Sequence, residues 1–132
     1  MLKINYYKDE HGSYPVLDFI LEQDEDTQAK ILRAIDLLGD MGLKLRKPHN
    51  EKIKNSPLWE LRIQLGNNIY RILFGVRNEA VLLHGFQKKT QKTPPGMIDL
   101  AEKRWDIYLK NLKLQTIGEQ SGKKVTKNKK KR

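Results

Sequence analysis

The sequence of 132 residues contains no cysteine, which excludes disulfide bonds and thiol chemistry and fits a reducing cytosol. It also lacks any apolar run near the roughly 18 residues that a membrane-spanning helix needs. The first residues, Met1–Tyr7, alternate like a short strand and have no apolar segment of the signal-peptide type. These absences predict one soluble, cytoplasmic domain without a membrane segment.

Several kinds of functional site are missing as well. There is no glycine-rich phosphate loop of the Walker type, and no serine or cysteine nucleophile set. The three histidines, His11, His49 and His84, have no ligand spacing with one another or with a carboxylate pair. The sequence therefore predicts neither a metal site nor a cofactor.

The positive charge is abundant and unevenly distributed within a formal net charge of +10. Residues 1–40 hold 4 basic and 9 acidic residues, which gives −5. Residues 41–92 hold 11 basic and 3 acidic residues, which gives +8, and residues 123–132 hold 7 basic and no acidic residues. Such a balance is typical of proteins that bind polyanions, although lysine-rich surfaces also serve solubility alone.

Period-2 alternation and helical stripes predict an α+β fold with a mostly antiparallel sheet of about four strands. Two helices are expected near the N-terminus, the second from Asp26 or Thr27, and one helix is expected from Pro94 with Thr93 as its cap. We assign residues 1–114 to the folded domain and residues 115–132 to a basic, flexible tail. The expected strands are Leu2–Lys8, Leu58–Leu65, Ile69–Arg77 and Ala80–Gln87.

Basic residues concentrate on and after the last three strands: Arg62, Arg71, Lys88 and Lys89, with His84 nearby. Taking "GNN" (Gly66–Asn68) as the turn places Ile63 near Arg71, so whether Arg62 and Arg71 share a face stays open. Arg71 interrupts the apolar string "IYRILF" and the lysines end a strand, so none of them is expected to anchor the core.

Such a group suits the cleavage of RNA by its own 2′-hydroxyl. Guanidinium groups bind phosphate oxygens and stay charged, and a lysine crowded by cations loses its proton more readily. His84 could also transfer protons near neutral pH. The plainer interpretation makes the arginines exposed sheet residues, His84 a hydrogen-bonded structural residue, and "HGFQKKTQKTP" (His84–Pro94) a loop that leads into a helix.

Two stretches, "LWELRIQLGNNIYRILF" (Leu58–Phe74) and "LLHGFQKKTQKTP" (Leu82–Pro94), resemble the RelE/HigB toxin superfamily, in particular its phage-derived HigB-like branch. The resemblance covers residues 2–113 in the order strand, two helices, three strands and helix. It implies the toxin of a type II toxin–antitoxin module, a metal-independent endoribonuclease that cleaves mRNA in the ribosomal A site. The implied partners are the ribosome with its mRNA and a cognate antitoxin, expected to be a small helix-turn-helix protein.

By position, the resemblance implies a catalytic site of Arg62, Arg71 and Lys88 or Lys89. The sequence departs from RelE at Glu60, where RelE has a lysine, and no tyrosine follows "KKTQKTP" until Tyr108. His84 is therefore also a candidate for proton transfer. Lys52, Lys54, Thr90 and Lys92 are predicted to bind RNA. The alternatives are a ParE-like inhibitor of DNA gyrase that acts by binding, and a non-catalytic relative that binds nucleic acid.

Overall fold

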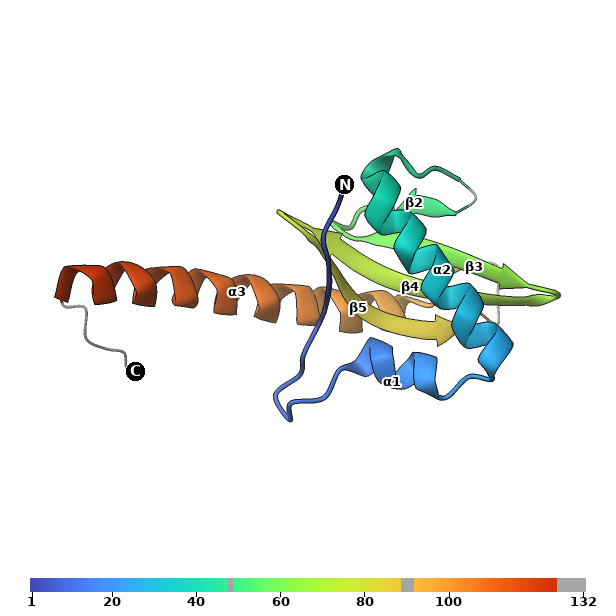
Figure 1. Ribbon diagram of the computed structural model, residues 1–132, viewed down its shortest axis with the longest axis horizontal. Coiled ribbons are helices and arrows are strands. Elements are labelled where there is room, and N and C mark those ends of the chain that lie inside the picture. Colours follow the sequence, from blue (N-terminus) through green and yellow to red (C-terminus); the bar gives the residue numbers. More distant parts are fainter. Residues whose placement is uncertain (48, 89–91, 126–132) are drawn as a thin grey trace.

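A mixed five-stranded sheet in the order β1-β5-β4-β3-β2 forms the centre of the molecule (Figure 1). The computed structural model describes residues 1–47, 49–88 and 92–125, with side chains up to residue 118. The strands are β1 (Ile4–Tyr6), β2 (Asn50–Lys52), β3 (Trp59–Leu65), β4 (Asn68–Val76) and β5 (Ala80–Gln87). The helices are α1 (Pro15–Leu21), α2 (Glu25–Met41), the short 3₁₀ turn η1 (Gly42–Lys44) and α3 (Pro95–Val125).

Helices α1 and α2 pack on one face of the sheet and build the larger core. Pro15 opens α1, where its missing N–H costs no hydrogen bond. Asp24 caps α2 by accepting a 2.8 Å hydrogen bond from the backbone N–H of Thr27. Apolar residues at helical spacing then face apolar residues at strand spacing, so this interface excludes charge. The fully buried members include Val16, Ile31, Leu38, Leu61, Ile72, Phe74 and Leu82.

Helix α3 packs on the opposite face with its N-terminal half. Ala101 and Trp105 join a second core with buried residues of β4 and β5, among them Leu73, Val81 and Leu83. A Cβ atom at Gly75 would lie 2.6 Å from the Trp105 ring, so the glycine permits this close approach. The rest of α3 projects well beyond the sheet (Figure 1).

The predicted α+β class, the mostly antiparallel sheet and the three-strand meander are confirmed, but the sheet differs in detail. It has five strands, because β2 forms within the basic connector and pairs antiparallel with Trp59–Leu61. Strand β1 pairs with β5 in parallel, so the sheet is mixed. A three-residue edge strand without an apolar face leaves little signal in the sequence.

The β3–β4 hairpin also differs from the count made on the sequence. Leu65 pairs with Asn68, so the turn has only two residues, Gly66 and Asn67, and Gly66 has a φ of 62°. The pairing therefore shifts by one residue. Arg62 lies directly opposite Arg71, and the placement of Ile63 beside Arg71 is wrong. The two arginines share one face of the sheet.

A register shift interrupts the β4–β5 ladder. Leu73 pairs with His84 while the next residue, Phe74, pairs with Leu82. Leu83 is thus the extra residue of a bulge. The side chains of both Leu83 and His84 therefore lie on the face of the sheet that α3 covers.

Helix α3 begins at Pro95, one residue after the expected Pro94, and continues to Val125. The predicted domain boundary after residue 114 therefore falls inside α3, and the part of the expected tail up to Val125 is helical. Residues 126–132 lie outside the described residues. Across the described ranges, no helix combines the length and the apolar composition that crossing a membrane requires.

Candidate functional site

Polar residues gather beside the start of α3, on the sheet face that this helix covers. Arg62 and Arg71 lie opposite each other on β3 and β4. Lys88 follows the last residue of β5, where its backbone N–H donates a 2.7 Å hydrogen bond to the carbonyl of Ile69. Glu60 shares the face of Arg62 because side chains alternate along a strand. We call Glu60, Arg62, Arg71 and Lys88, together with Thr93, the basic cluster.

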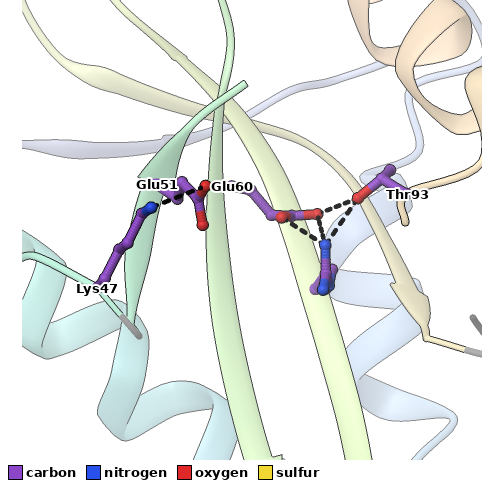
Figure 2. Close-up of polar contacts among 5 residues, drawn as sticks. Lys47, Glu51, Glu60 and Thr93 are labelled. Carbon is purple, nitrogen blue, oxygen red and sulfur yellow. Dashed lines mark hydrogen bonds and ion pairs between the residues drawn. The ribbon is translucent and has the colours of Figure 1, made fainter. Parts of the chain in front are cut away.

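The centre of the basic cluster is a buried ion pair. Nη1 of Arg71 donates to both carboxylate oxygens of Glu60, at 2.6 and 2.7 Å. The same nitrogen donates to the Thr93 hydroxyl at 2.8 Å. That hydroxyl donates in turn to Oε2 of Glu60. Figure 2 shows Glu60 and Thr93 pointing toward each other across this network, which ties β3, β4 and the entry to α3 together.

Burial changes the role expected of Arg71. Only 8% of Arg71 and 9% of Glu60 is exposed. Removing either partner would leave a charge without its counter-ion in a poorly hydrated place, which is costly. The expectation that Arg71 does not anchor the core is therefore wrong, because the guanidinium is a buried structural link as well as a source of positive potential.

A second carboxylate lies next to Glu60 across the β2–β3 ladder. Glu51 pairs with Glu60, and like charges opposite each other destabilise a sheet. Each carboxylate has its own cation, however. Lys47 Nζ lies 3.5 Å from Glu51, while Glu60 is held by Arg71 (Figure 2). The exposed Lys47–Glu51 pair adds little stability but keeps Glu51 from repelling an anion at the cluster.

Lys88 is the titratable group that this arrangement perturbs. Its partial burial lowers the pKa of the amine, and the positive charges of Arg71 and Arg62 lower it further. The carboxylate of Glu60 acts in the opposite direction. A lysine with a lowered pKa carries a larger fraction of free amine near neutrality, so it is better suited to accept a proton.

His84 lies away from this cluster, beneath α3. Its Nε2 is 3.0 Å from the Met97 sulfur, its Nδ1 is 3.4 Å from Nη1 of Arg104, and its ring stacks on Phe86. Burial, followed by the charge of Arg104, lowers the pKa of His84 to about 4. The ring is therefore neutral at physiological pH. These contacts agree with the structural interpretation of this histidine.

Of the remaining predicted residues, Lys52 ends β2 and Lys54 lies in the loop between β2 and β3. Lys52 donates from Nζ to the carbonyl of Ser56, within the loop that links β2 to β3. Lys54 and Lys92 are exposed. Lys89 and Thr90 lie outside the described residues. Of the predicted catalytic residues, the structure brings together Arg62, Arg71 and Lys88.

Three residues with clear roles here escaped the sequence reasoning. Glu60 was noted only as a departure from RelE, Thr93 only as a helix cap, and Arg104 not at all. Side chains alternate along β3, so Glu60 and Arg62 share a face. The sequence could therefore have indicated that Glu60 belongs to the cluster. Arg104 donates to the carbonyl of Leu83 at 2.7 Å because the bulge exposes that group, and a bulge has no simple sequence mark.

Comparison with known proteins identifies the family. Residues 18–106 match the model of the family described as phage-derived protein Gp49-like (DUF891). This range holds all of the basic cluster, whereas most of α3 beyond Trp105 lies outside it. No curated protein matches the chain. The chain belongs to the Gp49-like family of phage-derived proteins, a toxin–antitoxin-associated family related to the RelE/HigB type.

Proposed function

We propose that this protein is the toxin of a type II toxin–antitoxin module and that it cleaves mRNA on the ribosome without a metal ion. The observation that carries the proposal is the position of Lys88. Its amine has a lowered pKa and lies within the field of two arginines that face each other on one sheet surface. Family membership supports the toxin class, and the cluster supplies the chemistry.

The reaction transfers one proton and exchanges one bond at phosphorus. The free amine of Lys88 takes the proton of the 2′-hydroxyl, whose oxygen then attacks the adjacent phosphorus. The bond to the 5′-oxygen breaks, which leaves a 2′,3′-cyclic phosphate and a 5′-hydroxyl. The Lys88 ammonium returns the proton to the departing oxygen. Arg62, partly exposed on the same face, stabilises the charge that grows on the phosphorane oxygens.

Arg71 acts in this scheme as a positioning residue. Glu60 and Thr93 hold its guanidinium below the surface, so its charge reaches the phosphate and Lys88 through space. Glu60 also prevents the cluster from becoming excessively cationic, because it supports the protonated form of Lys88. The cluster then holds three basic side chains and one buried carboxylate, and this positive excess favours the binding of an anion.

The toxin would act in the cytoplasm on ribosomes and would be neutralised by a cognate antitoxin, for which a small helix-turn-helix protein remains the prediction. Co-expression with the product of the adjacent gene should then relieve growth arrest. An expressed chain that is harmless without any partner would contradict the toxin assignment.

The direct test is cleavage of mRNA on programmed ribosomes. Lys88→Ala should reduce the cleavage rate by roughly 10²–10³, the usual cost of losing one group that acts in the transition state. Lys88→Arg should be almost as inactive, because an arginine keeps the charge but does not release a proton. Lys103→Ala, which removes an exposed lysine from α3, is the matched control. Full cleavage by both Lys88 variants would reject this site, whereas no cleavage by the wild-type chain would favour a ParE-like protein that binds gyrase.

A further inference from the structure

A second basic surface lies around the edge of β3 from the cluster. Strand β2 pairs only with Trp59–Leu61, so within the described residues the later part of β3 pairs with β4 but has no strand along its outer edge. A groove of about 530 Å³ opens there between β3 and α2. We call it the β3 edge groove. Its lining includes Lys30, Arg33 and Leu37 from α2, His49 from the chain before β2, and Arg62 and Ile63 from β3.

The charged side chains among the lining residues of this groove are all basic. Lys30, Arg33 and Arg62 contribute cations, and no acidic side chain is among its lining residues. Within the described residues, neither Lys30 nor Arg33 forms an ion pair. These two cations therefore remain available although the region of residues 1–40 is acidic overall. Three cations around one concave surface concentrate a positive potential that attracts an anionic ligand.

Arg62 connects the groove to the basic cluster. Arg62 is among the lining residues of the groove, its side chain shares the sheet face of Arg71, and its charge contributes to the lowered pKa of Lys88. A ligand with one phosphate between Lys88 and Arg62 can therefore continue along the edge of β3 to Arg33 and Lys30. A polymer with an anionic group on every unit can bind to both surfaces at once, and the exposed apolar side chain of Leu37 offers a surface for a base.

We infer that the β3 edge groove binds the nucleotides of single-stranded RNA that flank the scissile phosphate, with Arg33 and Lys30 holding their phosphates. This inference rests on the proposed function, since it extends the path of the same substrate. An acidic peptide would also suit the charge of the groove. RNA fits better because Arg62 is common to the groove and to the basic cluster, where the proposed function places the scissile phosphate.

The test measures RNA binding by the full chain with 2′-O-methyl oligonucleotides, which lack the attacking hydroxyl and stay intact. The groove variant combines Lys30→Ala with Arg33→Ala. The control combines Lys110→Ala with Lys113→Ala, which removes two exposed cations at the same helical spacing from α3. Affinities for an octanucleotide and a trinucleotide are measured by fluorescence anisotropy between 50 and 200 mM salt, and thermal melts confirm that each variant folds.

The groove variant should bind the octanucleotide about tenfold more weakly at low salt and bind the trinucleotide within twofold of wild type. The slope of log K against log salt should become shallower by about 1.4, because each phosphate contact to a single strand contributes roughly 0.7 and the variant lacks two of them. The control pair should leave both affinities within about twofold, since its lysines lie outside the expected RNA path.

The outcomes separate this inference from the function on which it rests. Unchanged octanucleotide affinity in the groove variant, together with weaker binding by Lys88→Ala, would reject the groove and leave the proposed function standing. Unchanged RNA affinity in Lys88→Ala, Arg62→Ala and the groove variant would reject both. If the groove variant loses affinity for an oligoglutamate peptide but keeps its affinity for RNA, the groove is a peptide site and the inference is wrong.

Discussion

Two polar groups lie on the same face of the sheet, and the segments that cover them supply different partners. In the basic cluster, Glu60 and Thr93 surround the buried guanidinium of Arg71 with oxygen atoms. At His84, α3 brings a thioether and a second cation, so the ring remains neutral. An arginine stays charged in proteins, so the cluster offsets the burial of Arg71 with a carboxylate, whereas burial and a neighbouring cation keep the histidine neutral.

The largest effect on folding should come from breaking the ion pair of the cluster. Arg71→Ala leaves Glu60 buried without its cation and should lower the free energy of unfolding by about 3–5 kcal/mol. Urea denaturation followed by circular dichroism measures this change. The double replacement of Glu60 and Arg71 by Met should recover most of the loss, because apolar residues of similar volume need no counter-ion. If Arg71→Ala is as stable as wild type, the pair is not the structural link described.

A smaller effect should appear at His84 on acidification. The folded pKa of about 4 lies below the ordinary value near 6.5, so the unfolded chain takes up the proton first as the pH falls. The free energy of unfolding should therefore decrease between pH 6.5 and pH 4. Because the ring is only half-buried, we expect about 1 kcal/mol, well below the full linkage value. His84→Gln should remove this part of the pH dependence, and an unchanged pH profile would contradict the neutral buried ring.

The smallest expected effect concerns the pH dependence of cleavage. The charge of Arg62 helps to lower the pKa of Lys88, so Arg62→Gln should raise that pKa. The rising limb of the rate against pH then moves to higher pH, because more alkali is needed to free the amine. Arg77→Gln, at an exposed arginine after β4, is the matched control. A shift to lower pH in Arg62→Gln would mean that Lys88 is not the base.

The sequence was sufficient for the elements with strong periodicity. The alternation of β3, the apolar run at the start of β5 and the stripe of Ala101 and Trp105 on α3 predict which side chains are buried, and the structure buries them. Strand β2 carries no such pattern, because its three residues lie at an edge and two of them are exposed. Its existence follows from pairing with β3, which is a tertiary effect.

The candidate site was predictable in composition but not in geometry. Arg62, Arg71 and Lys88 were identified by charge and position, yet their juxtaposition depended on a turn of two residues in place of three. That single residue decides which side chain faces Arg71. The cations of the β3 edge groove were missed for a different reason. Lys30 and Arg33 belong to an acidic stretch, and their place beside β3 depends on how α2 packs against the sheet.

The connectivity of the sheet has a consequence for the order in which the protein folds. Every residue of the basic cluster lies between Glu60 and Thr93, in the β3–β4–β5 meander or directly after it, and the strand pairings of this meander join residues close along the chain. Strand β1 pairs with β5 across more than seventy residues, so its docking carries a much larger loop-closure cost. During synthesis, β1 leaves the ribosome first but has to wait for its partner strand. The meander that carries the cluster can pair while β1 is still undocked, and the N-terminal segment closes the sheet last.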